Sequence, residues 1–129
     1  MERIFVMVKP WSINHSEKIF CKLDLIGERL ETKAIESIPK EAVRLQHIEY
    51  KDASFFQLMI NDLTGQKCVI ALYKGNQDVF NKQKEILRER FGGDIVPLPS
   101  LKRNVLHISA SKQEFDRDFN AWRDYLNEY

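Results

Sequence analysis

Two short apolar runs constrain the fold of this chain more than any other feature of its sequence. Residues 4–8 (IFVMV) and 68–73 (CVIALY) are hydrophobic without interruption. Both have the length of a strand and fall far short of the ~20 residues that a membrane helix needs. The first run ends at Lys9-Pro10, where the proline stops ladder hydrogen bonding. We predict a central strand at 4–8, and at 68–73 a strand that is covered on both faces or paired centrally.

The remaining segments alternate between helical and extended patterns. Apolar residues recur near a 3.6-residue period in three longer stretches, and Gly27 suits the end of the first helix. Ser37 and Pro39 read as an N-cap and a first-turn proline, and Ser111 with Glu114 as a capping box. The predicted elements are strands at 4–8, 30–38 (more exposed), 68–73 and 105–110, and helices at 16–26, 39–48, 55–63, 78–91 and from 112 onward.

This order of elements predicts an α+β fold. Two βαβ-like halves of this size are typical of a four-stranded antiparallel sheet with helices packed on one face, the ferredoxin-like arrangement. The chain has 129 residues and shows neither an internal repeat nor a linker. We therefore expect residues 1–129 to form a single domain.

Composition and charge narrow the class of protein. With 43% hydrophobic and 30% charged residues, the sequence is not that of a disordered chain. Its net charge of +1 provides no general field for nucleic acid or an anionic membrane, so an anionic partner must be held locally. Cys21 and Cys68 do not make a disulfide framework or a zinc site. We expect a reducing, cytoplasmic setting, and the start MERIF is too short for a targeting segment.

One histidine is a candidate for chemistry. Strand alternation puts Val105, His107 and Ser109 on one face of the strand at 105–110, opposite an apolar set that we expect in the core. A neutral imidazole is available near pH 7 and can act as a nucleophile or a general base. Asp118, at the edge of the apolar stripe of the last helix, can orient it. On spacing alone, a half-buried strand histidine and a solvated aspartate are the simpler interpretation.

Lys9 is a second candidate, because a cation at the end of a central strand suits phosphate oxygens. The simpler interpretation is a lysine that extends its amine to solvent. His15 and His47 have no partner pattern, and we expect them at the surface or at helix caps. Motifs for a phosphate-binding glycine loop, a zinc site or a serine triad are absent from the sequence.

Two segments carry a resemblance to a known family. RIFVMVKP at 3–10 and RNVLHISAS at 103–111 resemble the signature segments of the nucleoside diphosphate kinase family. Residues 27–48 look like its second strand and following helix, and residues 53–75 look like its PFF helix and third strand. The resemblance covers nearly the whole chain, and the histidine segment is its specific part. It implies a ferredoxin-like βαββαβ fold with helices on the faces of the sheet.

The family resemblance also implies an activity. A nucleoside triphosphate gives its γ-phosphoryl group to a histidine, and the phosphohistidine passes it to a nucleoside diphosphate, with magnesium (Mg2+) bridging the phosphates. By position, His107 is the phosphorylated histidine, Asp118 its orienting carboxylate and Lys9 a phosphate contact. The other nucleotide-binding positions implied are Lys84, Arg88 or Arg90, Asn104, Ser109 and Phe55. The implied partners are nucleoside tri- and diphosphates, with no nucleic acid or membrane, and the chain is expected to be a homo-oligomer.

Departures from the family leave alternatives open. Trp11-Ser12 replaces a DG pair, Lys84 stands where an arginine is expected, and the loop between Phe91 and Asn104 is shorter than the family's. Arg88 and Arg90 are both candidates to replace an arginine of that loop. The first hypothesis is an active phosphotransferase, and the alternative is a catalytically impaired nucleotide-binding or regulatory module. An RNA-recognition domain is disfavoured, because no strand carries an aromatic-rich basic signature.

Overall fold

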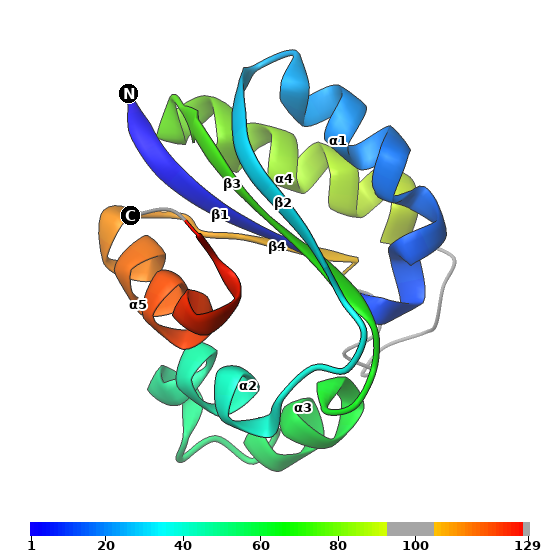
Figure 1. Cartoon of the computed structure of the whole chain (residues 1–129), viewed down its shortest axis with the longest axis vertical. Helices are drawn as coiled ribbons and strands as arrows, with labels where there is room; N and C mark the ends of the chain where they lie inside the picture. Colours follow the sequence, from blue (N-terminus) through cyan, green and yellow to red (C-terminus); the bar gives the residue numbers. More distant parts are fainter. Residues whose placement is uncertain (93–104, 128–129) are drawn as a thin grey trace.

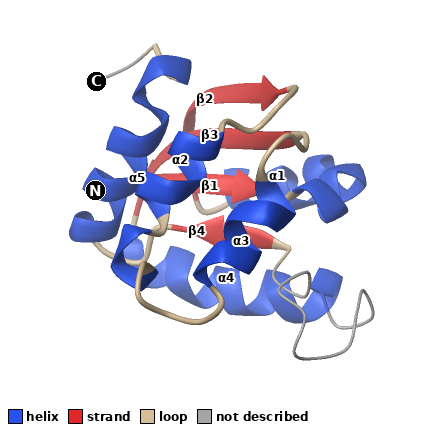
Figure 2. Cartoon of the chain, turned by 90° about the horizontal axis from the view of Figure 1, so that it is seen from below, coloured by secondary structure: helices blue, strands red, loops and turns tan. Residues whose placement is uncertain are grey.

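The computed structural model describes residues 1–92 and 105–127. Four strands form one antiparallel sheet in the order β2-β3-β1-β4 (Figures 1 and 2). The strands are β1 (Glu2–Val8), β2 (Gly27–Ile35), β3 (Cys68–Gly75) and β4 (Leu106–Ile108). Both predicted apolar strands, β1 and β3, lie in the centre, and β2 is the expected exposed strand at one edge. The ferredoxin-like α+β fold is confirmed.

Among the described residues, five α-helices and three short 3-10 helices connect and cover the strands. The α-helices are α1 (Ser16–Asp24), α2 (Lys40–Gln46), α3 (Phe56–Leu63), α4 (Gln77–Gly92) and α5 (Lys112–Trp122). The 3-10 helices are η1 (Pro10–His15), η2 (Ile48–Tyr50) and η4 (Arg123–Tyr125). In the described part of the chain, no helix combines the length and the apolar character needed to cross a membrane.

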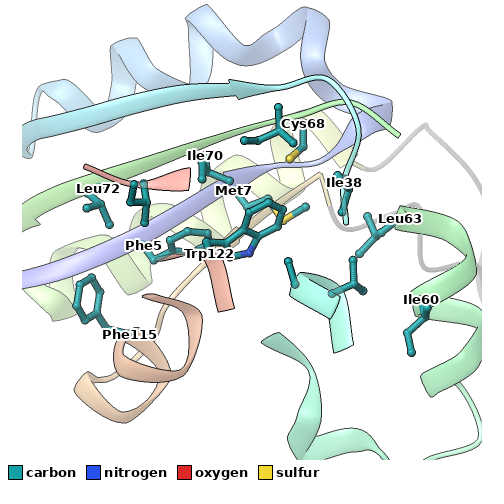
Figure 3. Packing of buried hydrophobic residues seen from close by; sticks show 14 residues of the cluster. Phe5, Met7, Ile38, Ile60, Leu63, Cys68, Ile70, Leu72, Phe115 and Trp122 are labelled. Atoms are coloured by element: carbon teal, nitrogen blue, oxygen red, sulfur yellow. The ribbon is translucent and has the colours of Figure 1, made fainter. Parts of the chain in front are cut away.

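The helices cover both faces of the sheet, as the family resemblance implies, so the prediction of helices on one face, made from the order of elements alone, was wrong (Figure 1). One face packs against α2, α3 and α5, and the other packs against α1 and α4. Figure 3 shows the first core, in which the Trp122 ring lies beside Phe5 and Met7. The indole nitrogen of Trp122 donates to Gln46 at 2.6 Å, which satisfies a buried donor. Strands that are apolar on both faces require this second layer, because one layer would leave half of their side chains in water.

Gly27 begins β2 and does not end the first helix as predicted, since α1 stops at Asp24. Gly27 pairs in register with Gly75, and the ring of Phe80 packs against both. A Cβ atom would come within 2.7 Å of that ring at Gly27 and within 2.5 Å at Gly75. These glycines therefore admit an aromatic ring from α4 to the sheet.

The predicted helix starts were correct at one of two places. Ser111 Oγ accepts from Glu114 N at 3.2 Å at the start of α5, as the capping box predicts, although the Glu114 carboxylate accepts from Ala110 N at 3.0 Å and so reaches one residue further back. At α2 the prediction was wrong: Pro39 occupies the N-cap and Ser37 is an exposed residue two positions earlier.

Candidate active site

A cavity of about 580 Å³ opens at the end of β1, beside β4. Segments that are far apart in the sequence contribute to its wall, including η2, the start of α3, and helices α4 and α5. The lining residues are Lys9, His47, Tyr50, Phe55, Met59, Lys84, Arg88, His107, Glu114 and Arg117. Four of them carry a permanent or near-permanent positive charge, which makes the cavity suited to an anionic ligand.

His107 and Asp118 form the most specific contact in this cavity. Asp118 Oδ2 lies 2.6 Å from His107 Nε2. The Asp118 carboxylate, on α5, is fully buried. The His107 side chain, on β4, is 16% exposed. Because an ionised carboxylate accepts, Nε2 carries the proton and Nδ1 keeps its lone pair. The two residues expected to act together are therefore adjacent, and Nδ1 is the nitrogen available for chemistry.

Lys9 follows β1 and is 7% exposed. Its backbone N–H donates to Val105 O at 3.0 Å, which ties the end of β1 to the strand that carries His107. Burial and the neighbouring charge of Arg88 lower the pKa of Lys9 to about 8. An anion in the cavity would offset both effects, so the geometry favours Lys9 as a contact for phosphate.

Lys84 and Arg88 project from α4 toward the backbone of β4. Lys84 Nζ donates to Ile108 O at 3.4 Å, and the Arg88 guanidinium donates to Leu106 O at 3.2 and 3.3 Å. Burial lowers the pKa of both side chains, and Arg88 lowers that of Lys84 further. Arg90, by contrast, is exposed, and its guanidinium lies over the ring of Phe91, 5.4 Å from the centroid. The structure thus brings Arg88 to the cavity and does not bring Arg90.

Ser109 takes a different position from the one predicted. It is fully buried, its Oγ accepts from Phe5 N at 2.9 Å, and its own N–H donates to Phe5 O at 2.9 Å. Val105 is also fully buried and belongs to the same core cluster as Leu106 and Ile108, so its expected separation from that apolar set was wrong. Both faces of the sheet are covered, and Ser109 completes the pairing of β1. Asn104, the remaining predicted contact, lies outside the described residues.

His47 is a cavity residue that the sequence analysis missed. It occupies the C-cap of α2, which is one of the two places where it was expected, but it is only 9% exposed and also lines the cavity. Its Nδ1 lies 2.9 Å from Val43 O. Burial lowers the pKa of His47 to about 4, which keeps it neutral at pH 7. His15 does occupy the N-cap position of α1, where its ring contacts Phe91. No local signal separates these two histidines, because the cavity is made by tertiary contacts.

Two aromatic rings form one wall of the cavity. Tyr50 in η2 and Phe55 before α3 have ring centroids 5.6 Å apart and are 45% and 38% exposed. Exposed rings beside a charged cavity suit a planar ligand that stacks on them. Phe55 was predicted for this site. The family resemblance also implies a tyrosine before this segment, at Ile48 or, after a shift of the alignment, at Tyr50, and the structure brings Tyr50 to the cavity.

Comparisons with known proteins support the resemblance. No protein-family model matches the chain. It is 26% identical to the nucleoside diphosphate kinase of Thermosynechococcus vestitus, over 95% of this chain and 87% of that one. A nucleoside diphosphate kinase structure from Encephalitozoon cuniculi superposes with a TM-score of 0.77 at 19% identity, covering 100% of this chain and 95% of the other.

A further solved structure contains a nucleotide. The nucleoside diphosphate kinase of Halobacterium salinarum, in complex with CDP, has a TM-score of 0.71 at 20% identity and covers 99% of this chain and 92% of its own. The sequence matches and the shared fold agree with the motifs around Lys9 and His107. The chain is therefore similar in sequence to curated nucleoside diphosphate kinases and has the ferredoxin-like fold of the solved ones.

Proposed function

We propose that this protein is a nucleoside diphosphate kinase that works through a phosphohistidine at His107. The observation that carries the proposal is the contact of Asp118 with Nε2, because it leaves Nδ1 of His107 as a nucleophile inside a cationic cavity. The names of the relatives give the same reaction class. Asp118 and Lys9 are the residues that we propose to act with His107.

The proposed reaction consists of two half-reactions. In the first, the lone pair of Nδ1 attacks the γ-phosphorus of a nucleoside triphosphate, a P–N bond forms, and the bond to the β–γ bridging oxygen breaks. The nucleoside diphosphate leaves with that electron pair. In the second half, a terminal β-phosphate oxygen of another diphosphate attacks phosphorus and the P–N electrons return to Nδ1. The Nε2 proton stays on the ring throughout, held by Asp118.

Lys9, Lys84 and Arg88 are the groups that we propose to bind the phosphates. Their positive charges surround His107 and stabilise negative charge that develops on the transferred phosphoryl oxygens. Phe55, with Tyr50, offers rings for the base. Stacking on aromatic rings distinguishes poorly between nucleobases, so we expect the protein to accept nucleotides with different bases. The CDP complex of the Halobacterium salinarum relative supports a nucleotide as the ligand class.

Magnesium is the cofactor that the resemblance implies. Among the described residues, no group of three or more His, Cys, Asp or Glu side chains is placed to hold a metal ion. Asp118 is occupied by His107 and Arg117, and Glu114 accepts from Ala110 N. The described side chains therefore do not offer a magnesium site by themselves, and we expect the ion to bind through phosphate oxygens. Contacts by Asn104, the cytoplasmic location and a homo-oligomer remain predictions.

Incubation with γ-labelled ATP and magnesium tests the proposal. We expect an acid-labile phosphate on the protein that is lost in His107→Ala and retained in His15→Ala, a histidine outside the cavity wall. Addition of an unlabelled diphosphate is expected to remove the label and yield labelled triphosphate. Label that persists in His107→Ala but is lost in His47→Ala would contradict the assignment. Nucleotide binding without any label would favour the alternative of an impaired binding module.

A further inference from the structure

Only one oxygen of the buried Asp118 carboxylate faces His107. The other, Oδ1, accepts from Arg117 Nε at 3.1 Å and from Arg117 Nη2 at 3.0 Å. The Arg117 side chain is 13% exposed and its Nη1 lies 3.2 Å from Glu49 Oε1. Glu49, Arg117, Asp118 and His107 thus form a continuous chain of polar contacts. It begins in η2, passes through α5 and ends on β4.

We infer that Arg117 is a positioning residue for His107, which acts through Asp118 to keep Nδ1 unprotonated and aimed into the cavity. The inference rests on the proposed function, because it assigns a role to Arg117 in making the nucleophile. The guanidinium fork takes one carboxylate oxygen with two donors, and this fixes the rotation of the carboxyl group. Oδ2 is then held toward Nε2 of His107 and accepts its proton in a hydrogen bond.

Charge explains why a second partner is needed. A carboxylate with no solvent exposure is stable in its ionised form only when paired and hydrogen-bonded. Burial opposes the charge of Arg117, but Asp118, Glu49 and Glu114 together raise its pKa above the ordinary value, so the guanidinium stays charged. The Arg117 charge is therefore a permanent partner for Asp118.

Loss of Arg117 has a defined chemical consequence. An unpaired buried carboxylate gains by turning its second oxygen toward another donor or by taking up a proton. A protonated Oδ2 would donate to Nε2, and the ring proton would then reside on Nδ1. That tautomer has no lone pair at the nitrogen that we propose to attack phosphorus.

The test uses the ¹⁵N resonances of His107 in the free protein, together with phosphorylation kinetics. In the wild type we expect Nε2 to be the protonated nitrogen. In Arg117→Gln we expect Nδ1 to gain proton character and the maximal rate of phosphorylation to fall by about 100-fold, with a smaller change in KM. Arg117→Lys keeps the charge without the fork, and we expect it to restore part of the rate. Arg44→Gln removes an exposed guanidinium that pairs with Glu41 and serves as the matched control.

The ¹⁵N measurement distinguishes the positioning role of Arg117 from the proposed kinase function. A tautomer change in Arg117→Gln supports the positioning role even where the wild type shows no phosphoryl transfer, a result that would sink the proposed function alone. An unchanged tautomer together with an unchanged maximal rate overturns the inference. A raised KM with an unchanged tautomer also overturns it, because Arg117 would then contact the nucleotide directly. Thermal unfolding of each variant shows that the fold is retained.

Discussion

Asp118 Oδ2 lies 2.6 Å from His107 Nε2, although the two residues belong to different layers of the molecule. His107 is held on the edge strand β4, whose partner is β1. Asp118 comes from α5, which packs against β1 on one face of the sheet. The contact thus requires the strand and the helix to be docked correctly, and it sets the tautomer of the imidazole.

Asp118→Asn tests the role of the carboxylate. An amide can present its NH2 group to Nε2, which would move the ring proton to Nδ1 and remove the nucleophilic lone pair. We expect the rate of His107 phosphorylation to fall by about 100-fold or more. Single-turnover labelling with γ-labelled ATP measures it. Asp116→Asn, an exposed carboxylate on the same helix that pairs with Lys112, is expected to keep the wild-type rate.

Nucleotide affinity is expected to depend on pH through Lys9. Its folded pKa of about 8 means that the amine is charged below that pH and neutral above it. Affinity for a nucleoside diphosphate should therefore weaken by about tenfold as pH rises from 7 to 10. His47 does not titrate in this range, because its pKa is about 4. Calorimetric titration measures the affinity, and a pH-independent affinity would show that Lys9 makes no ion pair with the ligand.

Stability gives a second test at Lys9 that needs no ligand. Between about pH 8 and the ordinary lysine pKa of 10.5, the unfolded chain binds a proton at this lysine that the folded chain does not. The free energy of unfolding therefore increases as pH rises through this window. Below about pH 8 the folded chain bears the full cost of burying a charged Lys9 amine. Lys9→Met should exceed the wild type in stability at pH 7 by about 1–3 kcal/mol, and the excess should shrink toward pH 10. Lys112→Met, at an exposed site, should show no such trend.

Arg88 and Arg90 can be distinguished by substitution. Arg88 lines the cavity, whereas Arg90 is exposed and packs over Phe91. Arg88→Gln should weaken nucleotide binding by about tenfold, since a charged donor to phosphate is lost. Arg90→Gln should weaken it by less than about twofold at physiological salt, through long-range charge alone. Equal losses in both variants would show that Arg90 reaches the nucleotide as well.

Ser109→Ala should affect stability more than binding. The substitution leaves the buried N–H of Phe5 without the Oγ acceptor at 2.9 Å. We expect a loss of about 1–3 kcal/mol in the free energy of unfolding, with nucleotide affinity nearly unchanged. Ser37→Ala is the control, because Ser37 is exposed and lies outside α2. Denaturant titration gives the free energies. A large loss of affinity in folded Ser109→Ala would restore the binding role that the resemblance implies.

Local patterns predicted the elements well and their ends less well. The apolar runs identified β1 and β3 because a strand with two apolar faces must lie inside a sheet. The end of α1 was placed too late, because Gly27 was interpreted as its C-cap. Gly27 instead makes room on β2 for the ring of Phe80 from α4. Strands with two apolar faces require helices on both sides of the sheet. The sequence does not specify which helix covers which face.

For the site, the sequence by itself pointed to His107 as the proposed nucleophile, to Asp118 as its carboxylate partner and to Lys9 after β1, because these residues occur in segments with a family resemblance. Only the tertiary structure decided the rest of the cavity wall. His47 and Arg117 carry no local pattern, because they reach the cavity only through the packing of α2 and α5 on one face of the sheet. The same holds for the preference for Arg88 over Arg90, and for the burial of Ser109. Burial and distance between residues remote in sequence are properties of packing, and they set the charge and orientation of every group in the site.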